Sequence, residues 1–385
     1  MMTARLTRYS NDLENLSRSH LRRRLEPING IDFTSNDFLA FSTAPQIREA
    51  VQSALEDGMP LGSGGSRLLR GNHRIHDELE TMAAETFGSE KALYFANGYS
   101  ANFAILTTLP RRNDLIIFDA LSHASIREGI FSSLAKNVKT PHNDVDAIEH
   151  VLADWRTSAS GSSMAWIMVE SLYSMDGDCA PLSDLVEVAE RYGAILIVDE
   201  AHATGVWGEN GRGLTEPFDG RRNLVAVHTC GKALGAAGGL VCTSSELIDF
   251  MINKCRPFIY STAPPPINAV AVMAALRLLD EEPRRRIDLL GLIKKANREL
   301  ELKFEKIGSQ TQIIPFVIGD EELTLRVASE MQQAGFDLRA IRPPTVPAGT
   351  ARLRISITLH ATEKNISDMF DELYTIVSNT DTDIS

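Results

Sequence analysis

Cysteine is scarce in this chain. The 385 residues include four cysteines, which are Cys179, Cys230, Cys242 and Cys255. They form no CxxC pair, and no group of histidines accompanies them. Disulfide frameworks and zinc sites need such groupings, so the sequence favours neither and predicts no metal site. Few thiols without a disulfide framework are typical of a reducing compartment, and we therefore expect a cytoplasmic protein.

Long apolar runs and an excess of positive charge are also missing. No stretch approaches the roughly 18 apolar residues that cross a membrane, and residues 1–20 lack the apolar core of a secretion signal. The formal net charge is −12 and the pI is near 5.3. Binding along nucleic acid or an anionic membrane needs a basic surface, so the sequence predicts neither as a partner. A small basic site for an anionic substrate remains compatible with this charge.

The sequence does contain an alternation of short apolar runs and amphipathic stretches. The apolar runs are residues 93–96, 115–118, 165–169, 194–198, 224–227 and 239–242. Between them, stretches such as 73–87 and 182–192 place their apolar residues on one helical face. Short, often β-branched runs suit strands that are buried on both faces of a parallel sheet. The alternation therefore indicates an α/β fold with a mostly parallel sheet.

The length of the chain favours more than one compact unit. We expect an N-terminal helical segment over 1–45, a large α/β domain over 46–275 and a smaller C-terminal α+β domain over 276–385. The second boundary follows from the prolines at 264–266, where the alternation breaks and a long helical stretch begins.

The first motif that suggests chemistry is AILIVDEAH at 194–202. A predicted strand ends at Asp199, and His202 follows shortly after it. Ligands of open α/β sheets bind beyond the carboxyl ends of the strands, where such side chains would face the site. An Asp at a strand end also commonly caps the following segment, and this motif alone does not decide between the two roles.

The second motif, HTCGKALGAAGG at 228–239, places Lys232 just after a predicted strand. Most lysines are surface charges. However, a lysine that is partly removed from water has a lowered pKa and can attack a carbonyl. Glycines on both sides would let the backbone and a cofactor approach closely. The spacing matches neither a P-loop nor GxGxxG.

Together, these motifs indicate pyridoxal phosphate. Lys232 can form a Schiff base with the aldehyde, and Asp199 can pair with the protonated pyridine nitrogen, which keeps the ring an electron sink. The phosphate needs an anion site. The turn NGYS at 97–100 follows one predicted strand and opens a helix, whose free N–H groups would favour a phosphate.

Motifs over nearly the whole chain resemble those of the α-oxoamine synthases, a family of fold-type I pyridoxal-phosphate enzymes. They are SNDFLA (35–40), GSGGSRLLRGNHRIHDELE (62–80), NGYSAN (97–102), SHASIREG (122–129), HND (142–144), YSMDGDCAPL (173–182), VDEAHATGVWGENGRG (198–213), HTCGKALGAAGG (228–239), YSTAPPP (260–266) and IRPPTVPAGTARLRIS (341–356). The resemblance implies the PLP-dependent transferase fold of type I. It also implies a homodimer with shared active sites, and a decarboxylative condensation of an amino acid with an acyl-CoA or acyl-carrier-protein thioester.

The stretch RPPTVPAGTARLR at 342–354 is most similar to the branch that condenses L-alanine with a pimeloyl thioester in biotin biosynthesis. The other motifs are shared with glycine C-acetyltransferases, 5-aminolevulinate synthases, serine palmitoyltransferase-like enzymes and condensing enzymes of secondary metabolism. A non-catalytic subunit would be expected to lack Lys232. A pyridoxal-phosphate-binding regulator would need a DNA-binding domain, for which the segment before the α/β region is too short.

The resemblance implies roles for residues around the cofactor. Lys232 would hold the cofactor and then move the substrate Cα proton, and Asp199 would pair with the pyridine nitrogen. His202 would contact the ring hydroxyl, while His123 would stack on the ring near the substrate. Further cofactor contacts are implied for Gly98, Tyr99, Ser174 and Thr229, the last at the phosphate end.

Other residues would contact the substrates or the partner subunit. Arg342 would bind the amino-acid carboxylate, and Thr345 and Arg22 would contact the acyl substrate or the product. Arg22 is equally well explained as one of several positive charges near the end of a solvated helix. Ser261 and Thr262 would reach the phosphate bound in the partner subunit.

Overall fold

The computed structural model describes residues 2–25, 27–159 and 161–382. The chain forms two compact units, Met1–Gly30 and Ile31–Ser385. The first contains the helix α1 (Met2–Arg18). Beyond α1, Arg22 donates a hydrogen bond from its guanidinium to the Ser17 hydroxyl at 3.4 Å, within the same unit.

Residues 31–45, which the sequence grouped with the N-terminal helix, belong to the second unit. They contain β1 (Ile31–Asp32) and the 3-10 turn η1 (Phe41–Thr43). The reason is backbone pairing, because β1 runs parallel to β10 (Phe336–Asp337). The Ser356 N–H also donates to the Phe33 carbonyl at 2.8 Å.

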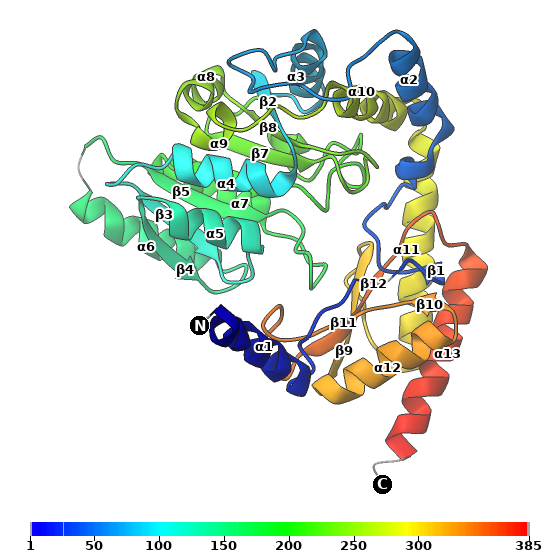
Figure 1. Cartoon of the computed structure of the whole chain (residues 1–385). Helices are drawn as coiled ribbons and strands as arrows, with labels where there is room; N and C mark the ends of the chain where they lie inside the picture. The colour runs from blue at the N-terminus through cyan, green and yellow to red at the C-terminus, as the bar shows by residue number, and fades with distance from the viewer. Residues whose placement is uncertain (1, 26, 160, 383–385) are drawn as a thin grey trace. The chain divides into compact units, whose positions relative to one another are not determined.

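A seven-stranded sheet forms the centre of the second unit, in the order β2-β8-β7-β6-β5-β3-β4 (Figure 1). The strands are β2 (Lys91–Phe95), β3 (Leu115–Asp119), β4 (Lys136–Thr140), β5 (Ala165–Glu170), β6 (Ile195–Asp199), β7 (Leu224–Thr229) and β8 (Gly239–Thr243). Among these seven strands, β8 runs opposite to the other six, and its pairings with β2 and β7 are the antiparallel ones. The predicted α/β fold with a mostly parallel sheet is confirmed.

Helices cover both faces of this sheet. They are α3 (Arg74–Thr86), α4 (Gly98–Thr108), α5 (Ala124–Ser132), α6 (Val145–Ser158), α7 (Leu182–Tyr192), α8 (Ser245–Lys254) and α9 (Arg256–Ile259). Successive strand residues point to opposite faces. In β6, Ile197 packs in the core formed with α4, α5 and α8, whereas Val198 packs in the core formed with α6 and α7. This two-sided burial explains why the strands read as continuous apolar runs.

The C-terminal part contains a three-stranded antiparallel sheet in the order β11-β12-β9. Its strands are β9 (Ile313–Gly319), β11 (Ala340–Ile341) and β12 (Ala351–Ser356). The helices of this half of the chain are α10 (Pro266–Glu281), α11 (Pro283–Phe304), α12 (Glu321–Gln333) and α13 (Glu363–Thr382). Both α2 (Pro45–Glu56) and α3 pack on α10. Because α10 runs across residue 275, a domain boundary at that position stays a prediction.

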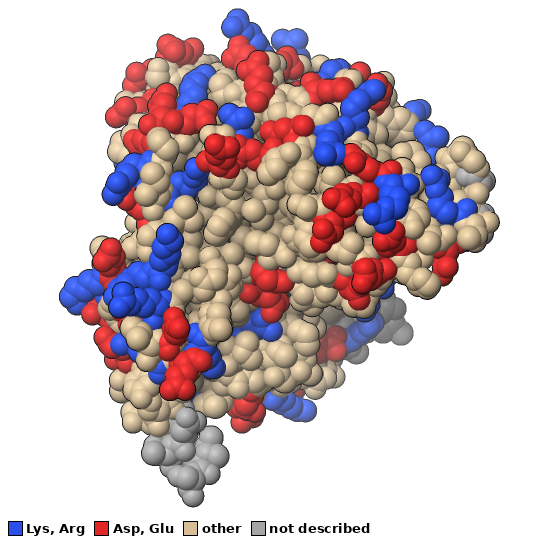
Figure 2. All heavy atoms as spheres, turned by 180° about the vertical axis from the view of Figure 1, so that it is seen from behind, with Lys and Arg blue, Asp and Glu red and all other residues tan. Residues whose placement is uncertain are grey.

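No helix within residues 2–25, 27–159 and 161–382 is long and apolar enough to cross a membrane. Figure 2 shows that basic and acidic side chains of the described residues alternate over one face, around a broad area of uncharged residues. All four cysteines are free, and Cys230, Cys242 and Cys255 are buried.

Candidate active site

The carboxyl ends of three neighbouring parallel strands bring charged side chains together. Asp199 ends β6 and pairs in register with Glu170, which ends β5. Lys232 lies in the loop after β7, which is closed by hydrogen bonds such as Cys230 N–H to the Gly238 carbonyl at 3.0 Å. The edge predicted from the sequence is therefore the edge at which the ionisable groups meet.

A cavity of about 200 Å³ opens at this edge. Its lining residues are Asn97, Gly98, Tyr99, Asn102, His123, Ser125, Glu170, Asp199, Ala201, His202, Thr229 and Lys232. Most residues predicted to contact the cofactor thus line one cavity, although they come from distant parts of the sequence. We call it the cofactor cavity.

Lys232 and His202 are in direct contact in this cavity, with 2.7 Å between the Lys232 Nζ and the His202 Nε2. The pKa of Lys232 is lowered to about 8, first by desolvation and also by the charge of Arg354, against the opposing charges of Asp199 and Glu170. The pKa of buried His202 is also lowered, first by desolvation and then by the Lys232 charge. Both groups are therefore easier to deprotonate than they would be in water.

The Asp199 carboxylate is buried and held in one orientation. It accepts hydrogen bonds from the Asn102 Nδ2 at 2.6 Å and from the Ala201 N–H at 2.9 Å. Asn102 also donates to the Ser125 hydroxyl at 3.1 Å. Sequence reasoning missed Asn102, because its contact with Asp199 joins residues far apart in the chain.

His123 is the N-cap of α5 and is fixed by hydrogen bonds to Glu170 and Ser125. Its backbone N–H donates to the Glu170 carboxylate at 2.7 Å, and its Nδ1 accepts from the Ser125 N–H at 3.2 Å. The neutral imidazole therefore carries its proton on Nε2. Desolvation lowers the pKa of His123, with further lowering by Lys232 and Arg127 against the opposing charge of Asp199. His123 is thus neutral near pH 7.

Glu170 is a second site residue that the sequence analysis missed. Burial, together with the neighbouring Asp199 charge, raises the pKa of Glu170 to about 8. A signal for it was present, because AWIMVE ends in a carboxylate just as ILIVD does.

The turn at the start of α4 provides the close approach expected for a phosphate site. Asn97 caps the helix by accepting from the Ser100 N–H at 2.8 Å. A Cβ built on Gly98 would lie 2.1 Å from the Thr229 hydroxyl oxygen, so only glycine fits there. Tyr99 remains 41% exposed and donates a hydrogen bond to Glu128.

These features fit pyridoxal phosphate. Lys232 offers a nucleophilic amine, and Asp199 offers an oriented carboxylate for a protonated ring nitrogen. The Gly98 turn lines the cavity at the N-terminus of α4, where free N–H groups favour an anion. Among the described residues, no group of three or more His, Cys, Asp and Glu side chains is arranged to hold a metal ion.

A second cavity, of about 410 Å³, shares His123 with the first. We call it the outer cavity. It contains two predicted residues that do not line the cofactor cavity, namely Ser174 and Thr345. Ser174 is buried, whereas Thr345 is exposed. Thr345 donates its N–H to the Arg342 carbonyl at 3.0 Å.

The remaining predicted residues line neither cavity. Arg342 lies half-buried in the loop between β11 and β12. Ser261 and Thr262 are exposed in the segment after α9. Arg22 belongs to the N-terminal unit.

The structure instead reveals a buried arginine that the sequence analysis did not single out. Arg354, on β12, donates to the Ser174 carbonyl at 2.6 Å and to the Asn36 Oδ1 at 2.9 Å. Burial lowers its pKa to about 10. Because its charge lowers the pKa of Lys232 and His202, it lies close enough to act electrostatically on the cofactor cavity.

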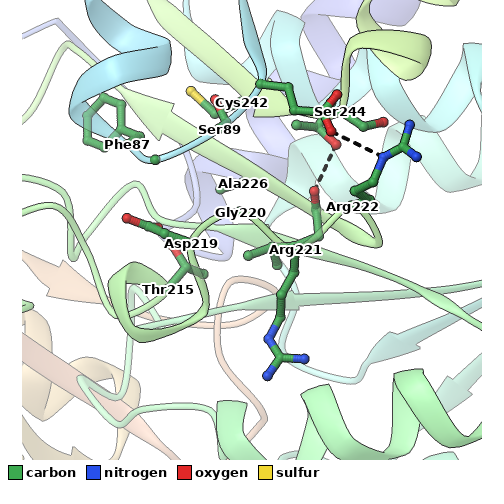
Figure 3. A pocket seen from close by; sticks show the side chains of 14 residues that line it. Phe87, Ser89, Thr215, Asp219, Gly220, Arg221, Arg222, Ala226, Cys242 and Ser244 are labelled. Carbon is green, nitrogen blue, oxygen red and sulfur yellow. Dashed lines mark hydrogen bonds and ion pairs between the residues drawn. The ribbon is translucent and has the colours of Figure 1, made fainter.

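A further cavity lies at the opposite end of β7, lined among others by Phe87, Asp219 and Cys242 (Figure 3). The Arg222 guanidinium there pairs with Glu90 at 3.1 Å. None of the predicted site residues lines it, so we do not assign it a role in the chemistry.

Comparison with known proteins shows the family of the chain. The family model for class I and II aminotransferases matches residues 28–372. The 8-amino-7-oxononanoate synthase of Geobacter sulfurreducens is 41% identical over 329 residues, which cover 84% of this chain and 82% of the relative. That of an Azoarcus species is 38% identical over 380 residues, which cover 95% and 96%.

Solved structures are similar over nearly the whole chain. A serine palmitoyltransferase variant from S. paucimobilis, with a bound pyridoxal phosphate–myriocin aldimine, gives a TM-score of 0.88 at 26% identity, over 99% of this chain and 100% of that one. The 8-amino-7-oxononanoate synthase of Francisella tularensis gives a TM-score of 0.77 at 27% identity, over 91% and 98%.

Proposed function

The chain belongs to the class I and II aminotransferase family of pyridoxal-phosphate enzymes, in its α-oxoamine synthase group, and from this premise we propose that it makes 8-amino-7-oxononanoate. The substrates would be L-alanine and a pimeloyl thioester of coenzyme A or of a carrier protein. The other products would be the free thiol and carbon dioxide. The reaction would serve biotin biosynthesis.

The observation that carries this proposal is the lowered pKa of Lys232 beside His202 and the two carboxylates, in a chain about 40% identical to synthases of this name. Bound pyridoxal phosphate supplies an electron sink for the negative charge that develops at the substrate Cα. The Lys232 amine would hold the cofactor and, once displaced by the amino acid, accept the Cα proton. A pKa near 8 suits both tasks close to neutral pH.

The other residues of the cofactor cavity would position the reactants. The fixed carboxylate of Asp199 would face the ring nitrogen, with Asn102 and the Ala201 N–H preventing its rotation. His123 would stack on the ring, and its protonated Nε2 would donate to the oxygen of the incoming acyl group. The Gly98 turn and Thr229 would hold the phosphate, together with Ser261 and Thr262 of the partner subunit.

Two arginines compete for the amino-acid carboxylate. The sequence resemblance implies Arg342, whereas electrostatics favours Arg354, whose charge acts on both Lys232 and His202. A buried guanidinium is also the stronger partner for a carboxylate, because little water competes with it. We therefore propose Arg354 as the main carboxylate partner.

A second candidate function is supported by the structural comparison. The TM-score to serine palmitoyltransferase is higher than that to the Francisella synthase. A serine-using enzyme with a long monocarboxylic acyl chain is therefore the alternative.

Absorbance titration of the cofactor-loaded enzyme with alanine, glycine and serine separates these two functions. Turnover of each amino acid should then be measured with pimeloyl-CoA, acetyl-CoA and palmitoyl-CoA. We expect alanine to give the largest spectral change and pimeloyl-CoA the fastest turnover. Faster turnover of serine with palmitoyl-CoA would favour the alternative.

A homodimer is part of this proposal. Backbone hydrogen bonding joins the segment around Gly65 to Ala263 at 2.9 Å. The same two segments expose large apolar side chains, with Leu61 at 73%, Leu69 at 84% and Tyr260 at 72%. Exposed apolar side chains on adjacent segments favour a contact with another subunit.

We also propose a cytoplasmic location, on the basis of the free thiols.

A further inference from the structure

The outer cavity extends from the reacting centre. Its walls are the start of α5 with the preceding loop, the loop after β5, and residues 344–347. Because His123 lines both cavities, a thioester whose carbonyl lies at His123 can extend its acyl chain into the outer cavity. Much of the wall is apolar, and includes Leu121, Met175 and Val346.

Two charged side chains interrupt this apolar wall, and only one of them is neutralised. Asp176 accepts a hydrogen bond from Arg352 at 2.5 Å. Arg127 is exposed, and no hydrogen bond or ion pair of its guanidinium occurs within the described residues. Its neighbour Glu128 is engaged by the Tyr99 hydroxyl. The outer cavity therefore has one cation without an anionic partner.

Arg127 also has a defined position relative to the reacting centre. Its N–H donates to the His123 carbonyl at 3.1 Å, so the two residues lie one helical turn apart on the same side of α5. Both residues line the outer cavity, and the Arg127 charge contributes to the lowered pKa of His123. An acyl chain that begins at His123 and follows the outer cavity would therefore pass along a wall that contains Arg127.

We propose that Arg127 is a specificity-determining residue that binds the free carboxylate at the distal end of an ω-carboxyacyl thioester. This inference rests on the proposed function, because the product named 8-amino-7-oxononanoate carries a carboxylate opposite its amino ketone. The guanidinium fork matches a carboxylate in a bidentate way. A monocarboxylic chain of equal length would leave Arg127 unpaired and would gain only apolar contacts.

The test compares pimeloyl-CoA with heptanoyl-CoA, which has the same chain length but no distal carboxylate. For the cofactor-loaded wild type with alanine, we expect kcat/KM to favour pimeloyl-CoA by at least about tenfold, the value of one hydrogen bond to a charged group. In Arg127→Leu this ratio should fall toward one, and Arg127→Lys should retain part of it. Arg326→Leu, an exposed arginine on α12, is the matched control and should keep the wild-type ratio.

Several outcomes would overturn this role for Arg127. A wild-type ratio near one, or an Arg127→Leu ratio equal to that of the wild type, would contradict it. An equal loss with both esters would show that Arg127 binds the phosphates of coenzyme A instead. The cofactor absorbance and the melting temperature verify that each variant is folded.

A failure of the proposed function is distinguishable from a failure of this inference. If the wild type turns over neither ester, the condensation proposal fails. The affinities of the two thioesters, measured by calorimetry, then still test the role of Arg127. Tighter binding of pimeloyl-CoA that is lost in Arg127→Leu supports it, and equal binding of both esters by the wild type contradicts it.

Discussion

At the scale of single residues, Lys232 differs from an ordinary lysine because its surroundings make the charged form costly. A lysine in water has a pKa near 10.4, and desolvation lowers that of Lys232 to about 8. Lys232 and Asp199 could be predicted at strand ends from the sequence, because apolar runs and glycines are patterns of neighbouring residues. Asn102, Glu170 and Arg354 were not predicted, because their roles depend on contacts between residues far apart in the chain.

The pH dependence of Cα proton exchange tests the role of Lys232. The amine must be neutral to accept the proton, so exchange of deuterium into alanine should rise with pH and level off above about pH 8. In Glu170→Gln the exchange rate should rise at lower pH than in the wild type, because the Glu170 charge raises the pKa of Lys232. This assignment would be contradicted if the exchange rate of the wild type rose only near pH 10, or if the rise moved to higher pH in the variant.

The two arginines near the amino-acid site can be told apart by conservative substitution. Arg354→Lys should raise the dissociation constant of alanine by about tenfold or more, since a bidentate charged contact is lost. Arg342→Lys should change it by less. Absorbance titration measures both constants, and melting temperatures control for stability. A larger effect at Arg342 would restore the assignment that the sequence implied.

At the scale of elements, pattern and turn chemistry decided what the sequence could predict. The strands β3, β5 and β6 are buried on both faces, so they appear in the sequence as continuous apolar runs and could be predicted. The strand β4, with the sequence KNVKT, was not predicted because it lies at the sheet edge and is mostly exposed. The turn that opens α4 was predicted from its residues, whereas the contact of Gly98 with Thr229 became evident only in the structure.

Gly98→Ala tests whether this turn is a cofactor site. The added methyl group would collide with the Thr229 hydroxyl, so the start of α4 would have to move and cofactor affinity should fall by about tenfold or more. Gly291→Ala on α11 is the matched control, because a Cβ there meets nothing within 4 Å. Titration of the apoenzyme of each variant with pyridoxal phosphate measures the cofactor affinity. Unchanged affinity in Gly98→Ala would exclude a tight fit at this turn.

At the scale of the whole molecule, composition and periodicity were sufficient for the fold class but not for its subdivisions. The α/β class follows from the alternation of strands and helices. The grouping of residues 31–45 with the C-terminal strands does not, because it depends on pairing between β1 and β10. The homodimer was expected from the family resemblance and not from composition or periodicity.

Light scattering tests the homodimer. The wild type should have twice the mass of the 42.3 kDa chain. The double variant Leu69→Glu, Tyr260→Glu should dissociate and lose cofactor affinity, because charged side chains replace exposed apolar ones at the proposed contact. The control Leu302→Glu, on α11 and 69% exposed, should remain dimeric. A monomeric wild type with full activity would rule out shared active sites.

The most direct measurement of the proposed function is mass spectrometry of the product formed from pimeloyl-CoA and L-alanine labelled with ¹³C at its carboxyl carbon. We expect 8-amino-7-oxononanoate without the label, the label in carbon dioxide, and free coenzyme A in equal amount. Lys232→Ala should form none of these. An unlabelled carbon dioxide pool, a product that keeps the labelled carbon, or an active Lys232→Ala enzyme would contradict a decarboxylative condensation that depends on Lys232.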